Sequence, residues 1–489
     1  MKNLSLQILQ LAAQHPDKPA IVTPRITLSW KIFGMQVEKF AAHMVSHGVD
    51  HGSCVALATR NPVVATSCML AVGMIGAKWR QVFASKPENA GETSIAATHL
   101  FHTFIDFSMQ TKAKVVQIDR RWQVFPPVRY REKLQAISND FDEDAIWYLS
   151  QSSGTTGRPK WMEISYENYW QRNEKAYLTH DFNPVITANL FPALSAPWVS
   201  YNMRSLWLGG TLVFGPRIDF FHKNNVQKVF GSPHHFSAFL GRQQAPPRQP
   251  LPIAHVAGGT ISRRLADSIL QWFSIIHNFY GSTEVGGVAR NLIDSTGGDL
   301  NCVGKVLAGN RVRIVDDDLR PLPEGETGRV CIQNDIMLDG YANNEEASTS
   351  SFVDGWFYPG DTGYLNEAGE LYLTGRYDDV VNVAGAKVNA AEVDRVIQSC
   401  PGVKQGICFV DTSEPLPRLM GLLVLDNNDI YSVLPRLQES IARELPRAKR
   451  IRGVYSVESI PVNANGKPLR QEAMDCLDGR SPVMIEEKP

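Results

Sequence analysis

The sequence predicts an α/β fold: a large N-terminal domain of α/β sheets with a β-rich subdomain, followed by a small, mobile α+β domain. The chain has 489 residues, more than a single hydrophobic core usually supports. Short β-rich runs alternate with helical patterns through the first half, which indicates a largely parallel sheet. After about residue 300, strands separated by Gly and Asp turns indicate a more antiparallel region.

Hydrophobic periodicity places the elements of the first half. The N-terminal segment MKNLSLQILQLAAQHPDKPA predicts an amphipathic helix that Pro16 stops, and residues 29–48 predict a second helix that ends at Gly48. The apolar run at 68–77 is typical of a buried helix. Further β-rich runs predict the following strands: VALATR at 55–60, KVVQI at 114–118 and AIWYLS at 145–150.

The second half divides near GRYDDV at 375–380. RVRIVDDD, GRVCIQN and ELYLTGR predict strands before this point. Beyond it, helical patterns at 391–399 and 432–445 flank the strands QGICFV and MGLLVL. We therefore expect an N-terminal domain over residues 1–377 and a C-terminal domain over residues 378–489, with a hinge at Asp378.

Composition excludes several classes of partner. The formal net charge is −1, so no strong field favours nucleic acid or an acidic membrane surface. No apolar run approaches the roughly 20 residues that a membrane span needs. The seven cysteines are scattered without a CxxC pair or zinc spacing. Such a set is typical of reduced thiols, and we expect a cytoplasmic protein.

The stretch SSGTTGRPKW at 152–161 has the chemistry of a phosphate-binding loop. Its hydroxyls, its two glycines and Lys160 suit a polyphosphate, because glycine lets the backbone approach a ligand closely. It is not a Walker loop, since Pro159 precedes the lysine and a predicted strand follows it. Taken alone, the loop is equally compatible with a flexible link.

The motifs downstream resolve that choice. The loop resembles the phosphate signature of the adenylate-forming superfamily, which includes acyl- and aryl-CoA synthetases, peptide-synthetase adenylation domains and luciferases. Further segments resemble the same family in the expected order: ISYENY at 164–169, NFYGSTEVGG at 278–287, GETGRVCIQNDIMLDGYANN at 325–344, GWFYPGDTGYL at 355–365, GRYDDVVNVAGAKVNAAEVD at 375–394 and ANGKPLR at 464–470. A stand-alone acyl- or aryl-acid AMP ligase is the form it most resembles.

The resemblance implies a two-step reaction with ATP and Mg²⁺. A carboxylate attacks the α-phosphate of ATP to give an acyl-adenylate, and a thiol then displaces AMP. The thiol belongs to CoA or to the phosphopantetheine of a carrier protein. Lys467 is the implied catalytic residue of the first step, Glu284 the magnesium ligand, and Lys160 and Thr283 contact phosphates. The DDVVNVAGAK form of the hinge motif favours CoA as the acceptor.

The implied ATP-binding residues come from six segments of the chain. Tyr280 would stack on adenine, Asp361 would bind both ribose hydroxyls, and Arg376 would reach the ribose or a phosphate. The small domain would rotate about Asp378 and bring Gly385 and Lys387 to a thiol tunnel. The full set of ATP-binding residues is Ser152, Ser153, Gly154, Thr155, Thr156, Gly157, Lys160, Gly258, Gly259, Thr260, Asn278, Phe279, Tyr280, Gly281, Ser282, Thr283, Asp361, Arg376 and Lys467.

The acid pocket departs from the family pattern. Ser195 stands where an aromatic residue or histidine usually shields the pocket, with Phe191 or Trp198 as candidate substitutes. Ala196 stands where α-amino-acid enzymes keep an aspartate, so a substrate ammonium would have no partner and we expect an acid without an α-amino group. An aryl or a short or medium acyl acid fits the expected pocket walls, which are Trp198, Tyr201, Asn202, His234 and Gly281.

Three alternatives remain open at this stage. The protein is a CoA ligase, a loader of a carrier protein, or a non-catalytic nucleotide-binding relative. His234 and His235 follow Gly-Ser-Pro and are equally compatible with capping a helix. Trp161 departs from the small residue usual behind the loop lysine; it either packs under the loop or narrows access to the acid, and we favour packing.

Overall fold

The computed structural model describes most of the chain. The described residues are 2–82, 96–104, 111–138, 141–152, 160–179, 185–377, 380–383, 386–411, 413, 417–427, 429–462, 468–477 and 479–485. Within them, no helix is long and apolar enough to cross a membrane. All seven cysteines are free thiols, and six of them are buried.

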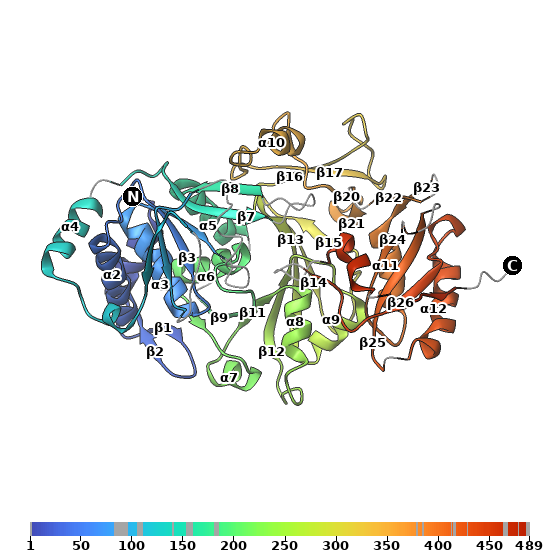
Figure 1. Ribbon diagram of the computed structural model, residues 1–489, viewed down its shortest axis with the longest axis horizontal. Helices are drawn as coiled ribbons and strands as arrows, with labels where there is room; N and C mark the ends of the chain where they lie inside the picture. Colours follow the sequence, from blue (N-terminus) through green and yellow to red (C-terminus); the bar gives the residue numbers. More distant parts are fainter. Residues whose placement is uncertain are drawn as a thin grey trace.

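The first sheet is built by the N-terminal third of the chain (Figure 1). Its strands run in parallel except for the antiparallel pair β7 and β8. In spatial order the strands are β6 (Lys114–Gln117), β5 (His99–His102), β3 (Cys54–Ala58), β4 (Lys78–Gln81), β7 (Ile146–Ser152) and β8 (Lys160–Ser165). The helices of this region are α1 (Leu4–Gln14), α2 (Trp30–Ser46), α3 (Pro62–Ile75), α4 (Val128–Ser138) and α5 (Tyr166–Thr179).

The second sheet changes from parallel to antiparallel strand pairing along its width. Its parallel part has the order β13 (Phe273–Ser282), β12 (Leu251–Ala257), β11 (Lys228–Gly231), β9 (Ile186–Asn189), β10 (Thr211–Val213) and β1 (Pro19–Val22), with β2 (Thr27–Ser29) antiparallel at its edge. Helices of this region are α6 (Ala196–Trp207), α7 (Ile218–Lys223), α8 (Pro233–Leu240) and α9 (Arg263–Leu270). Beyond β13 the same sheet continues with antiparallel strands in the order β14 (Gly286–Ile293), β15 (Cys302–Val306), β21 (Glu370–Arg376), β20 (Asp361–Leu365), β17 (Gly328–Gln333), β19 (Trp356–Phe357) and β18 (Phe352–Val353). Strand β16 (Arg311–Val315) also pairs with β17. Helix α10 (Glu345–Ser351) contacts β18. The predicted shift from parallel to antiparallel pairing is confirmed.

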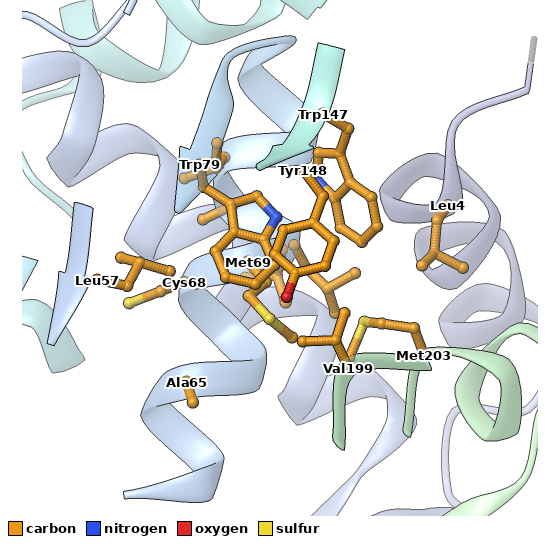
Figure 2. Close-up of a cluster of buried hydrophobic side chains, with 14 of the residues drawn as sticks. Leu4, Leu57, Ala65, Cys68, Met69, Trp79, Trp147, Tyr148, Val199 and Met203 are labelled. Carbon is orange, nitrogen blue, oxygen red and sulfur yellow. The ribbon is translucent and has the colours of Figure 1, made fainter. Parts of the chain in front are cut away.

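A core of large aromatic side chains joins the first sheet to its helices (Figure 2). Trp79 stacks on Tyr148 with ring centroids 4.3 Å apart, and Trp147 meets Trp79 edge-on at 6.1 Å. Met69 of α3 and Met203 of α6 pack in the same cluster, so α6 is seated on this core. Burial of aromatic rings at this scale is a major stabilising contribution, and it fixes the position of α6.

The C-terminal residues form a separate core. Strands β24 (Val403–Asp411), β25 (Arg418–Leu425), β26 (Gly453–Ser456) and β27 (Val483–Met484) pair in that order, and α11 (Ala390–Ser399) and α12 (Ile430–Glu444) belong to the same region. A hairpin of β22 (Val380–Val383) and β23 (Ala386–Asn389) precedes them. The predicted α/β class with a smaller α+β region is confirmed, whereas the division at residues 377 and 378 stays a prediction.

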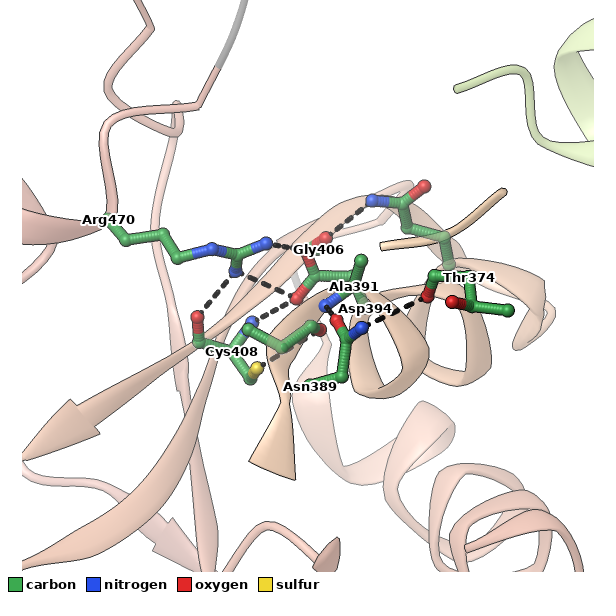
Figure 3. A network of polar contacts seen from close by, with 9 residues as sticks. Thr374, Asn389, Ala391, Asp394, Gly406, Cys408 and Arg470 are labelled. Carbon is green, nitrogen blue, oxygen red and sulfur yellow. Dashed lines mark hydrogen bonds and ion pairs between the residues drawn. The ribbon is translucent and has the colours of Figure 1, made fainter. Parts of the chain in front are cut away.

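A polar network anchors α11 to this second core (Figure 3). Asp394 is 8% exposed and forms an ion pair with Arg470, which also donates to the Cys408 carbonyl at 2.7 Å. The Cys408 amide donates to Asp394 at 2.6 Å. Because Arg470 follows the ANGKPL segment, this network fixes the chain on the C-terminal side of the predicted lysine loop.

Candidate active site

A cavity of about 400 Å³ lies between helices α5 and α6 and the ends of strands β12 and β13. The turn from β13 to β14 forms one wall, with residues 279–284 lining it. At this turn Gly281 has no room for a side chain, because a Cβ there would lie 2.2 Å from the Gly286 carbonyl oxygen. The glycine of the YGSTE motif is therefore required by the close approach of the two strands.

One end of the cavity is centred on Glu284. This side chain is 7% exposed, and its Oε1 accepts a hydrogen bond of 2.9 Å from the Tyr341 hydroxyl. The Lys160 ammonium lies 4.8 Å from the centroid of the Tyr341 ring. Burial, together with the Glu284 charge, raises the pKa of Tyr341, so its phenol stays protonated and donates. Tyr341 thus connects the loop lysine with the YGSTE glutamate.

The backbone of this turn is held by Arg172 of α5. Its guanidinium donates to the carbonyls of Thr283 at 2.7 Å and Glu284 at 3.2 Å, and to that of Ile336 at 2.9 Å. Burial lowers the pKa of Arg172 to about 10, so it remains charged at neutral pH. Sequence motifs did not identify Arg172, because the three carbonyls that it binds lie more than a hundred residues away along the chain.

A second polar cluster lies where β20 and β21 pair. Asp361 and Arg376 are register partners, and the Arg376 guanidinium donates to Asp361 Oδ1 at 2.9 Å. The Tyr280 hydroxyl donates to the other carboxylate oxygen at 2.6 Å. Burial and the Asp361 charge raise the pKa of Tyr280. Residues from three separate motifs therefore meet beside the cavity wall.

Aromatic rings line the other half of the cavity. Tyr201 stacks on Phe230 at 4.3 Å, and its hydroxyl lies 3.1 Å from His255 Nε2. His255 in turn stacks on Phe279 at 4.0 Å. Phe191 also lines the cavity and stacks on Tyr201 at 6.1 Å. This half is suited to a flat, largely apolar group.

The predicted pocket residues separate into two groups. Tyr201 and Gly281 line the cavity, whereas Trp198, Asn202 and His234 are not among its lining residues. Trp198 is 1% exposed and stacks on Phe214 in the core, and Asn202 accepts from the Asn189 amide at 3.1 Å. Of the two candidates to shield the pocket, Phe191 faces the cavity.

The structure describes some of the remaining predicted site residues and leaves others out. Gly258 lines the cavity, Gly259 and Thr260 are exposed beside it, and Asn278 is buried in β13. Ser195 is the N-cap residue of α6. Several predicted residues lie outside the described part of the chain, or have only their backbone described: Ser152, Ser153, Gly154, Thr155, Thr156, Gly157, Asp378, Gly385, Lys387 and Lys467.

A comparison with protein families shows which family the chain belongs to. The model of the AMP-binding enzyme family matches residues 9–342, more than half of the chain. The chain belongs to the AMP-binding enzyme family. The resemblance inferred from the motifs is thereby confirmed.

Individual relatives are distant but match over the full length. A 2-succinylbenzoate–CoA ligase from Bacillus cereus is 24% identical over 98% of this chain and 99% of its own. Surfactin synthase subunit 1 from Bacillus subtilis is 25% identical over 93% of this chain, which corresponds to 13% of that much longer protein. Among solved structures, o-succinylbenzoate CoA synthetase (MenE) from Bacillus subtilis in complex with the acyl-adenylate intermediate OSB-AMP has a TM-score of 0.79 at 18% identity, covering 98% of each chain.

Proposed function

We propose that this protein is an AMP-forming ligase that joins a carboxylic acid without an α-amino group to the thiol of CoA. In the first step a carboxylate oxygen bonds to the α-phosphorus of ATP, and the bond to the β-phosphate oxygen breaks to release pyrophosphate. In the second step the thiol sulfur, having lost its proton, bonds to the acyl carbon and AMP leaves. Both first-step reactants are anions, so the site must neutralise charge and align them.

The observation that carries this proposal is the convergence of distant motifs on one cavity. At one end Glu284 lines the cavity and contacts Tyr341, whose ring faces Lys160. At the adjoining wall the Tyr280 hydroxyl donates to Asp361, which pairs with Arg376. A cation, a buried carboxylate and a second carboxylate are the groups that phosphates, a divalent metal and ribose hydroxyls would need.

The residues fit a magnesium ion that arrives with the nucleotide. Among the described residues, no group of three or more His, Cys, Asp or Glu side chains is placed to hold a metal alone. Magnesium typically takes one or two carboxylates and completes its shell with substrate phosphates and water. Glu284 would supply that carboxylate, and the metal would neutralise phosphate charge.

The nucleotide would occupy the wall formed by the β13–β14 turn. The Ser282 Oγ atom is buried on this wall and has no hydrogen-bond partner among the described residues, which favours a polar ligand there. Asp361 would accept hydrogen bonds from the ribose, and Gly258, Gly259 and Thr260 would flank the base. Lys467 would bridge the carboxylate and the α-phosphate, with Asp378 as the hinge and Lys387 near the thiol.

The proposal also specifies which thiol accepts the acyl group. CoA is favoured because a CoA ligase is similar over the full length of this chain, whereas the surfactin synthase match covers a fraction of that protein. A carrier protein presents the same thiol arm. Rates of thioester formation with CoA and with a holo carrier protein would separate the two.

Acid-dependent exchange of radiolabelled pyrophosphate into ATP tests the proposal. We expect exchange with at least one acid from a panel of benzoates, cinnamates and fatty acids, and its loss in Lys467→Ala. The same variant should still transfer the acyl group from pre-made acyl-AMP to the thiol. Nucleotide binding without pyrophosphate release across the whole panel would instead support a non-catalytic relative.

A further inference from the structure

Positive charge is concentrated in one segment of the chain. Residues 112–133 contain seven Lys or Arg and two Asp or Glu, a net charge of +5, whereas the whole chain carries −1. This segment forms β6, the short 3-10 helix η2 (Arg120–Gln123) and the first half of α4. Helices α2 and α4 contact each other and lie at the end of the molecule away from the C-terminal region (Figure 1). The low net charge of the chain therefore conceals a basic region at this end.

Aromatic packing fixes this segment on α2. The buried Trp122 ring stacks on His43 of α2 with centroids 5.0 Å apart, and Phe40 meets it edge-on at 5.2 Å. His43 Nε2 also lies 2.9 Å from the Val124 carbonyl oxygen. The chain that follows Trp122 is therefore held against the helix, and its outward side chains form a defined surface.

Four large apolar side chains of this region face solvent. Val124 and Val128 are 64% and 65% exposed, and Ile32 and Met35 of α2 are 51% and 42% exposed. Positions 32, 35, 39 and 43 recur at helical spacing and share one face of α2, which leads to Val124 through the contact with His43. Isolated exposed apolar residues are common, whereas several on one surface indicate a binding site.

Cations lie among these apolar side chains. Helices α2 and α4 together contain five Lys or Arg and two Glu. Lys39 and Arg131 lie over opposite parts of the same neighbourhood, at 5.5 and 4.3 Å from the centroid of the Phe125 ring, next to Val124 in the chain. The α2–α4 surface is defined here by Lys31, Ile32, Met35, Lys39, Val124, Val128, Arg129, Arg131 and Lys133.

We propose that the α2–α4 surface binds a membrane surface that contains anionic phospholipids. Lys and Arg side chains are attracted to the negative headgroups, and aliphatic side chains between them enter the boundary between headgroups and acyl chains. The net charge of the chain did not indicate such a partner, because it averages this region with a more acidic remainder. The binding does not depend on the proposed ligase function.

Two other partners fit this surface less well. A second copy of the chain that docked through the same surface would bring like charges together. Single-stranded nucleic acid is typically bound by exposed aromatic rings on which bases stack. Here Trp122 is buried, the Phe125 ring is in contact with Lys39 and Arg131, and the exposed apolar side chains are aliphatic. These features favour lipid.

Co-sedimentation of the full chain with vesicles tests this inference. The probes are vesicles of phosphatidylcholine alone and vesicles that also contain about 30 mol% phosphatidylserine, in about 0.1 M salt. We expect binding to the anionic vesicles to be at least about tenfold stronger, and to weaken in about 0.5 M salt, because ions screen the charges.

Two double variants separate the contributions of charge and apolar contact. Arg129→Gln with Lys133→Gln should weaken binding to anionic vesicles by about 10- to 30-fold, since each cation near the membrane contributes about fivefold. Val124→Ser with Val128→Ser should weaken it by about tenfold and leave the salt dependence unchanged, because only apolar contact is lost. Neither pair lines the cavity, so pyrophosphate release in solution should be unchanged in both.

The matched controls lie elsewhere on the molecule. Arg242→Gln with Arg248→Gln replaces two exposed arginines after α8, and Tyr431→Ser replaces an exposed ring on α12; both should bind vesicles as the wild type does. The inference would be overturned by absent vesicle binding, by equal binding to both kinds of vesicle, or by equal losses in the surface and control variants. Binding of single-stranded RNA without vesicle binding would assign the surface to nucleic acid instead.

Discussion

Trp161 follows the loop lysine and is 3% exposed. It packs with Cys54, Leu149 and Ala342, and its carbonyl accepts a hydrogen bond of 2.7 Å from the Ala342 amide. It is not among the residues that line the cavity. The indole therefore ties the strand behind the loop to the segment that carries Tyr341, consistent with the packing role favoured from the sequence.

Replacing this indole should weaken the nucleotide site more than the acid site. We expect Trp161→Ala to lose about 3–5 kcal/mol of unfolding free energy, the usual cost of deleting a buried aromatic ring. The KM for ATP should rise while the preference among acids is retained. Urea unfolding and steady-state kinetics measure both; the half-buried Trp356→Ala provides the control. A changed acid profile with an unaltered KM for ATP would place Trp161 on the acid side instead.

Glu284 should determine the magnesium requirement. Glu284→Gln keeps the shape and removes the charge, so we expect pyrophosphate release to fall at least about 100-fold, as expected when a charge-stabilising group is removed from an active site. The Mg²⁺ concentration for half-maximal rate should rise. Glu163→Gln, an exposed position on β8, is the control. An unchanged magnesium titration would contradict the assignment.

The sequence identified motif residues better than buried cations. Glu284, Asp361 and Arg376 were predicted from motifs that resemble the family; Glu284 lines the cavity, and Asp361, which pairs with Arg376, accepts from Tyr280 of the cavity wall. Arg172 was not predicted, because a charged side chain is normally exposed. Its burial depends on carbonyls from elements distant in the chain, which a local pattern does not encode.

At the scale of the element, α8 begins with a capping box. Ser232 accepts from the His235 amide, and the Ser232 amide donates to His235 Nδ1 at 3.4 Å. Burial and the neighbouring His234 lower the pKa of His235 from its usual 6.5 to about 4. The capping role left open from the sequence therefore describes His235.

This cap should make stability depend on pH. Because the folded pKa is below the unfolded value, the unfolded chain takes up the proton first. The contribution of His235 is complete above pH 6.5 and is lost as the pH falls towards 4. His235→Gln retains a capping side chain without titrating, so its unfolding free energy should fall less between pH 7.5 and 5.0. Identical losses in both proteins would exclude this origin.

The Asp394–Arg470 pair should be important for folding of the C-terminal region. We expect Asp394→Asn to lose about 3–5 kcal/mol of unfolding free energy, because breaking a buried ion pair leaves a charge without compensation. Glu444→Gln, in an exposed pair with Arg443, should change it by less than about 1 kcal/mol. Urea unfolding of both variants checks this, and equal effects would contradict it.

For the whole molecule, the elements were easier to predict than their assembly. Helical and strand periodicities located α2, α11 and β24 closely, since each depends on local side-chain spacing, whereas the helix predicted at 68–77 begins six residues earlier, as α3. The join between a parallel and an antiparallel half in one sheet was not predicted as a single sheet. Strand order is set by contacts between segments far apart, for example β9 between β10 and β11.

Among the described residues, an ion pair between Arg264 and Asp426 connects the large body to the C-terminal region. Arg264 of α9 donates to both oxygens of Asp426, at 2.7 and 2.9 Å, and to the Val403 carbonyl at 3.3 Å. If the C-terminal region rotates between the two half-reactions, as proposed, this contact exists in one arrangement only. Removing it should shift the balance between the arrangements.

We therefore expect Arg264→Ala and Asp426→Ala to change the ratio of the two half-reaction rates in the same direction. A change of about two- to fivefold is expected, because a partly exposed pair contributes at most about 1 kcal/mol. The charge-swapped double variant Arg264→Asp with Asp426→Arg should return the ratio towards the wild-type value. The effect should shrink at high salt, since ions screen exposed charges. Opposite shifts in the two single variants would show that the pair does not select between the arrangements.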